Sequence, residues 1–313
     1  MTIAIKPRIL LVDDEERILR TLTMLLRMQY QVFATTDGYE ALKIMQKEKI
    51  HVLISDQRMP TMVGTELLRH ARERHPNTIR ILLTGYADVD AAVDSVNEGE
   101  IFRYINKPWG PKELRDTIAD AVAIALKLEQ VNIPSFPLPT PAKGINCLVL
   151  DEDVSVYETV RDILGDQHHV LWRTTIASAL TVLASQSVAV LVTELQVADG
   201  DASVMIKTLK QEYPALLTII NTSFKDTQRV AQLINQAQVY RYLPKPLRKG
   251  LLAKSLESTL SRYKQLQDLP VLKEVIKVEQ SSDVQEKAVS SKIADYLAKI
   301  RAKGFGGSKP ALA

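Results

Sequence analysis

Apolar and polar positions along the first 130 residues follow two alternating patterns. Apolar runs of strand length stand at 9–12, 32–34, 52–55, 79–83 and 102–105. Between these runs, apolar residues recur every three or four positions, as in 16–28, where Ile18, Leu22 and Leu26 share one helical face. Strands that alternate with helices predict a parallel sheet covered on both faces, which is the doubly wound α/β class. We expect a last helix from Pro111 to about Glu129.

Residues 130–144 break this alternation. The segment holds four prolines in eight positions, Pro134, Pro137, Pro139 and Pro141. Proline has no backbone N–H and a fixed φ, so the segment favours extended geometry over a helix. We predict a semi-rigid, proline-rich linker at 130–144, which closes a first domain at 1–129.

The chain then repeats itself at an offset of 138 residues. ILLVDDEE at 9–16 corresponds to CLVLDEDV at 147–154. The same offset, without a gap, relates Arg103-Tyr104 to Arg241-Tyr242 and Lys107-Pro108 to Lys245-Pro246. The repeat predicts a second domain of the same fold at about 145–267.

Charged and hydroxyl residues stand at the ends of four predicted strands of the first domain. Asp13 and Asp14 follow the first strand, Asp56 ends the third, Thr84 ends the fourth and Lys107 follows the fifth. Ligands bind such sheets outside the carboxyl ends of the strands, so we expect one crevice that holds all of these groups.

This set of groups suits phosphoryl transfer. Clustered carboxylates repel one another unless a cation lies among them, and oxygen ligands suit Mg²⁺. A carboxylate beside Mg²⁺ can attack a phosphoryl group, while an ammonium and a hydroxyl hold its oxygens. Taken singly, these residues also fit purely structural roles: Asp13-Asp14 as a helix cap, Thr84-Gly85 as a turn, and Tyr104 as a core aromatic.

The motifs VDDE, SDQRMPTMVG, LLTGYAD and YINKPW resemble the receiver domain of two-component response regulators, over residues 8–128. The resemblance implies a flavodoxin-like fold with strand order 2-1-3-4-5 and Asp56 as the phosphoryl acceptor. It also implies Mg²⁺ ligated by Asp14, Asp56 and the backbone carbonyl of Arg58, with Asp13 acting largely through water. By the same resemblance Thr84 and Tyr104 are the paired switch residues, Lys107 contacts the phosphate, and the Lys107–Pro108 bond is usually cis.

The second domain keeps this pattern only in part. Asp151, Glu152 and Glu194 stand where the first domain has Asp13, Asp14 and Asp56, while Thr222 and Lys245 are retained. A glutamate moves the acceptor oxygen by ~1.5 Å, and a misplacement of ~1 Å can cost about 100-fold in rate. We therefore predict a degenerate pseudo-receiver. Either Glu194 reaches towards Lys245 and Thr222 as an acidic mimic, or the domain is kept for packing alone.

Composition and charge exclude several classes of protein. The hydrophobic share of 46% and charged share of 25% are those of soluble globular protein, and no apolar run spans a membrane. The single Cys147 cannot form an internal disulfide, which favours the cytoplasm. The net charge is +3, but residues 287–313 carry six cations against Asp295 alone. A basic footprint over a whole domain is absent, so nucleic acid is an unlikely partner.

The remaining residues, 268–313, are predicted to form a helical and partly mobile basic tail. Apolar spacing marks two short amphipathic stretches, at 271–276 and at 289–300, the latter followed by Gly304 as a stop. Such a face docks on the protein's own core or on a dimer partner, binds another protein, or lies on a membrane surface.

Together these patterns and the resemblance to receiver domains imply two tandem flavodoxin-like domains and a cytoplasmic response regulator without an enzymatic output domain. A sensor histidine kinase or a histidine phosphotransfer protein would supply the phosphoryl group, with Mg²⁺ as cofactor, and an unknown protein effector would read the signal. A homodimer is compatible with the sequence. The alternatives are a phosphate sink or relay intermediate and, with less support, a DNA-binding regulator that uses the basic tail.

Overall fold

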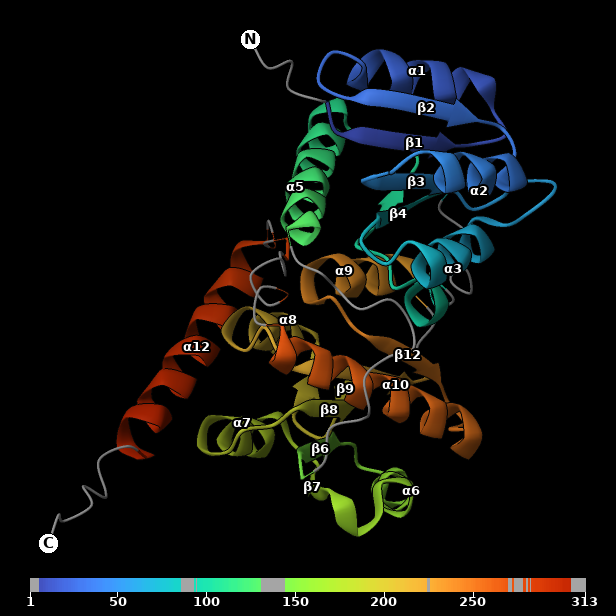
Figure 1. The fold of residues 1–313 in the computed structure, drawn as a ribbon. Coiled ribbons are helices and arrows are strands. Elements are labelled where there is room, and N and C mark those ends of the chain that lie inside the picture. The colour runs from blue at the N-terminus through green and yellow to red at the C-terminus, as the bar shows by residue number, and fades with distance from the viewer. Residues whose placement is uncertain are drawn as a thin grey trace, which may run out of the picture. The chain divides into compact units, whose positions relative to one another are not determined.

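The structure is a computed structural model, and it divides the chain into two compact units (Figure 1). It describes residues 6–85, 93, 95–130, 144–223, 226–269, 272, 278–279, 281 and 283–304. The first unit consists of residues 1–138, 225–235 and 274–277, and the second of residues 139–224, 236–273 and 278–313. Each unit therefore contains segments that are far apart in the sequence. The predicted linker, apart from its two end residues, lies outside the described residues.

The first unit is built on a five-stranded parallel sheet. Its strands are β1 (Arg8–Val12), β2 (Gln31–Thr35), β3 (Val52–Asp56), β4 (Ile79–Thr84) and β5 (Arg103–Asn106). Their order is β2-β1-β3-β4-β5 and every pair is parallel, which confirms the predicted order 2-1-3-4-5. Val12 lies opposite Thr35 and Ser55, so the carboxyl ends of the first three strands meet at one edge.

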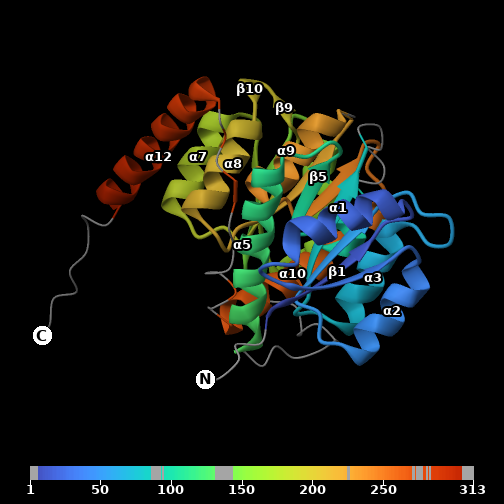
Figure 2. The ribbon, with the colours of Figure 1, turned by 90° about the horizontal axis from the view of Figure 1, so that it is seen from above.

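Helices flank this sheet in the doubly wound manner. They are α1 (Glu16–Leu26), α2 (Gly38–Lys47), α3 (Gly64–Arg74), the short π-helix η1 (Ser95–Gly99) and α5 (Pro111–Glu129). α1 packs beside α5, and α2 packs beside α3 (Figure 2). α1 buries Leu19, Leu22 and Leu26. The helix predicted at 16–28 ends earlier, at Leu26. Just beyond this end, the Lys6 ammonium donates to the carbonyl of Met28 at 2.8 Å, and the chain then turns into β2.

The second half of the chain forms a sheet with the same strand order. Its strands are β6 (Asn146–Leu150), β7 (His169–Arg173), β8 (Val190–Thr193), β11 (Leu217–Thr222) and β12 (Arg241–Pro244). They run parallel in the order β7-β6-β8-β11-β12, which is again second-first-third-fourth-fifth along the chain. A small antiparallel hairpin, β9 (Gln196–Val197) with β10 (Gly200–Asp201), follows β8 and was not predicted.

The helices of this half follow the same alternation. They are α6 (Val154–Leu164), the 3₁₀ turn η2 (Gly165–Gln167), α7 (Ile176–Ser185), α8 (Ser203–Glu212), α9 (Thr227–Ala237) and α10 (Lys249–Asp268). All of α9 except its last two residues belongs to the first unit. Within the described residues, no helix is both long and apolar enough to cross a membrane.

The tail contains the helix α12 (Val284–Gly304), which docks on α7 and α8 of the second unit. The apolar face predicted at 289–300 is only partly buried: Leu297 is fully buried, but Val289 and Tyr296 are 45% and 41% exposed. Polar contacts supplement the docking, because the Lys207 ammonium binds both carboxylate oxygens of Glu286 at 3.0 Å. The stretch predicted at 271–276 lies outside the described residues, except for the buried Leu272.

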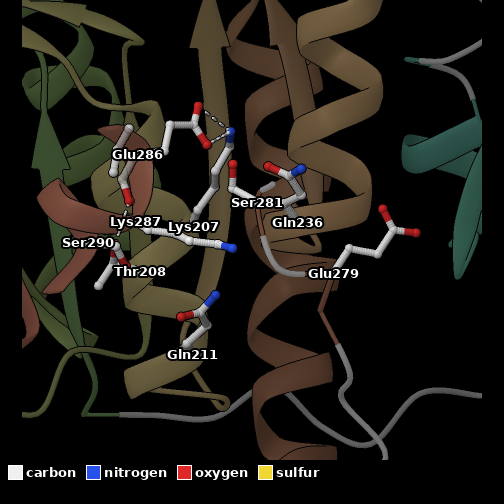
Figure 3. A pocket seen from close by; sticks show the side chains of 10 residues that line it. Lys207, Thr208, Gln211, Gln236, Glu279, Ser281, Glu286, Lys287 and Ser290 are labelled. Atoms are coloured by element: carbon white, nitrogen blue, oxygen red, sulfur yellow. Dashed lines mark hydrogen bonds and ion pairs between the residues drawn. The ribbon is translucent and has the colours of Figure 1, made fainter. Parts of the chain in front are cut away.

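A polar cavity of about 160 Å³ lies beside this docked helix (Figure 3). Lys207 and Thr208 of α8 line it, together with Glu286 and Ser290 of α12. The Thr208 hydroxyl donates to the Ser290 hydroxyl at 2.9 Å, so hydrogen bonds join the two helices along this wall. The tail is therefore held on the protein's own second unit, which is one of the three outcomes that its sequence left open.

Candidate functional site

The Lys107 ammonium lies between two buried carboxylates at the carboxyl edge of the first sheet. Its Nζ is 2.7 Å from Oδ2 of Asp13 and forms an ion pair with Oδ1 of Asp56. Asp13 is 1% exposed and Asp56 is 5% exposed. The backbone N–H of Lys107 donates to the carbonyl of Thr84 at 2.7 Å. The ends of β1, β3, β4 and β5 thus meet around one cation, as the strand pattern predicts.

The carboxylates also accept backbone hydrogen bonds. Oδ1 of Asp13 accepts from the N–H of Glu15 at 2.9 Å, and Oδ2 of Asp56 accepts from the N–H of Arg58 at 2.5 Å. Burial raises the pKa of Asp13, although its hydrogen bond to Lys107 opposes this effect. Burial opposes the charge on Lys107, but the hydrogen bonds to Asp13 and Asp56 and the negative charges of these two groups together outweigh burial and raise the Lys107 pKa. The site therefore favours a charged lysine.

The loop from β3 to α3 is held tightly over this site. A Cβ on Gly64 would lie 2.1 Å from the carbonyl oxygen of Asp56, so only glycine fits there. The Gly64 N–H donates to the carbonyl of Gln57 at 3.0 Å. At the top of the loop, the Thr61 hydroxyl donates to Asp37, the N-cap residue of α2, at 2.8 Å. These contacts fix the backbone that carries Asp56 and Arg58.

The two residues implied as switches are buried. Thr84 is 2% exposed, and its hydroxyl donates to the carbonyl of Gly85 at 3.3 Å. Tyr104 is 1% exposed and lies on β5, one of the two edge strands of the sheet. Its backbone contacts Asn235 of α9, a residue that sequence reasoning missed. No local motif points to that contact, since 131 residues separate the two positions.

The oxygen donors of the site fit Mg²⁺ in kind. Asp13 and Asp56 converge on a single cation, and the negative charge of Asp56 adds to the raised pKa of Asp13, so an added cation would relieve their repulsion. Asp14, the third predicted ligand, is exposed. In the part of the chain that the structure describes, no three His, Cys, Asp or Glu residues stand together as a ready metal cage.

The second sheet carries a corresponding but altered cluster. The Lys245 ammonium is 2.8 Å from Oε2 of Glu194 and 3.0 Å from Oδ2 of Asp151. The other Glu194 oxygen accepts the N–H of Leu195 at 2.7 Å. Glu194 is 8% exposed, Thr222 is 2% exposed, and Glu152 is exposed. The longer side chain of Glu194 thus reaches the lysine, in line with one of the two alternatives that the sequence left open.

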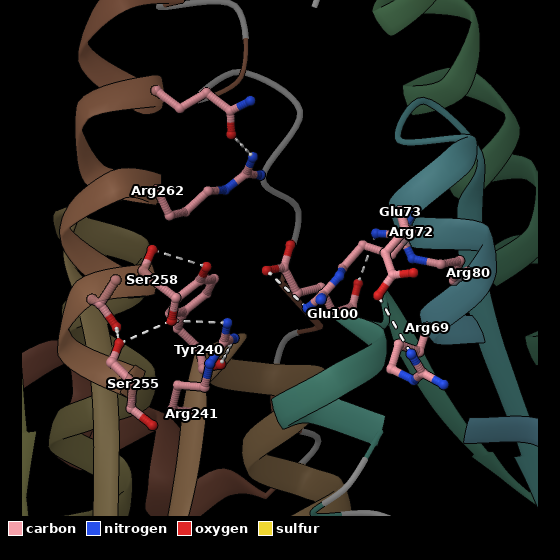
Figure 4. Close-up of polar contacts among 12 residues, drawn as sticks. Arg69, Arg72, Glu73, Arg80, Glu100, Tyr240, Arg241, Ser255, Ser258 and Arg262 are labelled. Atoms are coloured by element: carbon pink, nitrogen blue, oxygen red, sulfur yellow. Dashed lines mark hydrogen bonds and ion pairs between the residues drawn. The ribbon is translucent and has the colours of Figure 1, made fainter. Parts of the chain in front are cut away.

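The repeat extends to contacts beside the two sites. Arg103 donates to the carbonyl of Phe102 at 2.9 Å and lies 4.0 Å above that ring. At the same offset, Arg241 donates to the carbonyl of Tyr240 at 2.7 Å and lies 3.9 Å above its ring (Figure 4). The X–Pro bonds after Lys107 and Lys245 are both cis. The two halves therefore share local geometry as well as strand order.

Comparison with known proteins identifies the first part of the chain. Residues 9–119 match the family model of the response regulator receiver domain. The hydrogenase transcriptional regulatory protein HoxA of Cupriavidus necator is 39% identical over 114 residues, which cover 36% of this chain and 24% of that protein. The sensor kinase CckA of Brucella abortus is 33% identical over 115 residues, 36% of this chain and 12% of that protein.

Among solved structures, the receiver domain of an HD domain-containing protein from Pseudomonas fluorescens is similar, with 35% identity and a TM-score of 0.40. That match covers 42% of this chain and 96% of that one. By their match to the family model, residues 9–119 are a receiver domain of the kind found in two-component response regulators, for which phosphorylation and Mg²⁺ are general features. The matched part spans about a quarter of the length of the HoxA regulators.

Proposed function

We propose that this protein is a response regulator whose phosphoryl acceptor is Asp56. A sensor histidine kinase or a histidine phosphotransfer protein would supply the phosphoryl group, and contacts with an effector protein would transmit the signal. The observation that carries this proposal is the Lys107 ammonium, which lies between the buried carboxylates of Asp13 and Asp56. That arrangement supplies a nucleophile, a cation for the transferred group, and a second carboxylate in one place.

The proposed reaction follows from these contacts. A carboxylate oxygen of Asp56 attacks phosphorus in line, and the bond to the donor nitrogen breaks with its electron pair remaining on that nitrogen. The Arg58 N–H holds Oδ2 of Asp56, which fixes the direction of the carboxylate. Lys107 then binds an oxygen of the new acyl phosphate, and the Thr84 hydroxyl turns from Gly85 to donate to another.

Asp13, Asp14, Asp56 and the Arg58 carbonyl would hold Mg²⁺, whose charge offsets that of the transferred group. Asp14 would turn inwards from its exposed position to complete this set.

For the second half of the chain, we propose a pseudo-receiver that takes no phosphate. The Glu194–Lys245 ion pair supports a carboxylate that imitates a phosphoryl group. The glutamate oxygen already binds the lysine ammonium that a phosphoryl oxygen would contact. In this proposal the output is neither an enzyme nor a DNA-binding domain, and protein contacts transmit the signal.

The test is a mass measurement on the full chain. After incubation with a small phosphodonor and Mg²⁺, intact mass should show one added phosphate per chain. Asp56→Ala should abolish the addition, while Glu194→Ala, the matched control in the second sheet, should leave it unchanged. Two phosphates per chain, or one that persists in Asp56→Ala, would contradict the proposal.

A further inference from the structure

The edge of the first sheet carries a contact that the receiver chemistry does not require. β5 is an edge strand, and on such a strand alternate residues turn their N–H and C=O groups away from the sheet. At Tyr104 both groups are bound by one side chain. The Tyr104 N–H donates to Oδ1 of Asn235 at 2.9 Å, and Nδ2 of Asn235 donates to the Tyr104 carbonyl at 2.9 Å.

This pair of hydrogen bonds is selective for the residue type. A primary amide offers one acceptor and two donors in a plane, which matches the N–H and C=O of a strand residue as a neighbouring strand would. Aspartate has nearly the same shape but no donor, so it would face the Tyr104 carbonyl with a negative oxygen. Asn235 therefore acts as a clasp that takes the place of a missing strand.

The clasped residue lies on the strand that leads into the phosphorylation site. Lys107, which binds Asp56, follows the last residue of β5, and its N–H bonds the carbonyl of Thr84. In the strand register Thr84 lies opposite Asn106, two residues beyond Tyr104. A phosphoryl group on Asp56 would draw Lys107 and Thr84 to new partners, and the strand between them also carries the clasp.

We propose that α9 reads the phosphorylation state of the first receiver through the Asn235 clasp on Tyr104. This inference rests on the proposed function, since it requires Asp56 to carry the phosphoryl group. The surface is the open edge of β5, and its occupant is α9, whose residues up to Asn235 belong to the same compact unit. In sequence, α9 joins β11 to β12, so a change at the clasp reaches the segment that connects two strands of the second sheet.

Phosphorylation can change how often the Asn235–Tyr104 hydrogen bonds are formed only if α9 binds the two states of β5 with different affinity. Two neutral hydrogen bonds set the scale of the effect, and their loss changes an opening equilibrium by roughly tenfold to a hundredfold.

The first measurement is amide hydrogen exchange of Tyr104 in the full chain, followed by NMR. Asn235→Ala and the near-isosteric Asn235→Asp should both speed exchange at Tyr104 by about tenfold or more. Gln232→Ala, at an exposed position of the same helix, is the matched control and should change nothing. Exchange at Tyr104 that is the same in all four proteins would overturn the clasp.

The second measurement adds beryllofluoride and Mg²⁺ as a phosphoryl mimic, with ¹⁹F NMR to show that the mimic is bound. Exchange of the α9 amides at 229–235 should change in the wild type and in Gln232→Ala, but not in the Asn235 variants. If the mimic binds and α9 responds equally in every variant, the clasp is not the reader. If no bound ¹⁹F signal forms in any variant, the proposed function at Asp56 fails, and the reader role fails with it. The exchange at Tyr104 still decides whether the clasp itself exists.

Discussion

The two lysine clusters of this chain share their geometry but differ in the one side chain that matters for chemistry. In the first, Lys107 joins Asp13 and Asp56; in the second, Lys245 joins Asp151 and Glu194. Both lysines have a raised pKa, with burial opposed by hydrogen bonds to two carboxylates. A single methylene therefore leaves the electrostatics in place while it changes how far the carboxylate reaches. The comparison shows that the ion pairs of such a cluster can be kept while the position of the carboxylate, on which reactivity depends, is changed.

The loops beside the two clusters also share a hydrogen bond but differ in how closely they approach the carboxylate. Gly64 packs against the Asp56 carbonyl, where a Cβ would lie at 2.1 Å. Its counterpart Ala202 accommodates a Cβ, and its N–H still bonds the carbonyl of Leu195 as that of Gly64 bonds Gln57. The β9–β10 hairpin precedes Ala202, so the second loop follows a different path to the same hydrogen bond. We infer that only the first loop is built for close approach to the acceptor.

Exchanging the two corresponding carboxylates, Asp56 and Glu194, should give the largest effect. Asp56→Glu should keep the ion pair with Lys107 but slow phosphorylation by at least ~100-fold, because the nucleophile is displaced by more than ~1 Å. Glu194→Asp should restore little or no reaction, since the loop above it differs. Intact mass against time with a small phosphodonor and Mg²⁺ measures both. Fast phosphorylation of Glu194→Asp would show that the side chain alone separates the two sites.

Exchanging the loop residues should have a smaller effect. Gly64→Ala should destabilise the first unit by about 1–3 kcal/mol, because its Cβ meets backbone that cannot give way easily. Ala202→Gly, the matched change in the second unit, should cost less than about 1 kcal/mol. Calorimetric unfolding of the full chain measures both changes. Equal shifts in the two variants would mean that the close approach at Gly64 has no special cost.

A third pair of corresponding residues predicts a small dependence on pH. Arg72 in the first unit forms an ion pair with Glu100 at 3.6 Å, whereas Lys210 in the second is buried and binds the carbonyl of Pro214 at 2.9 Å. Burial, with a contribution from Arg262, lowers the Lys210 pKa to about 7 from 10.5. The unfolded chain then binds more protons than the folded chain between these values, so stability should rise with pH there.

The expected slope for the second unit is at most about 1.4 kcal/mol per pH unit above pH 7. Denaturant unfolding at pH 7, 8 and 9 measures it. Lys210→Met should remove the slope, while Arg72→Met, the matched change in the first unit, should not alter it. A slope that survives in Lys210→Met would assign the dependence to another group.

Much of this architecture was predictable because it is local. Apolar runs separated by helical spacing indicated the strands, and the rule that parallel strands end at one edge brought Asp13, Asp56 and Lys107 together. The contact of Asn235 with Tyr104 was not predictable, since it depends on tertiary packing between distant positions. The burial of Lys210 was missed because lysine ordinarily lies at the surface. In α12, polar contacts supplement the buried Leu297, so the apolar spacing at 289–300 overstated how much of the helix face is buried.

The contact between the β3–α3 loop and the N-terminus of α2 has a consequence for transplanting parts between the two halves. In the first half the helix supplies the carboxylate, Asp37, and the loop supplies the hydroxyl of Thr61. In the second half the loop supplies the carboxylate: Asp199 accepts the N–H of Ile176 at 2.6 Å and that of Ala177 at 3.1 Å, while the Thr175 hydroxyl caps the helix by accepting the N–H of Ser178. A graft of the first loop alone would therefore remove the carboxylate that binds the N-terminus of α7, and the reverse graft would place the carboxylate of Asp199 beside that of Asp37. The loop and the helix cap must therefore be exchanged together if their contacts are to be kept.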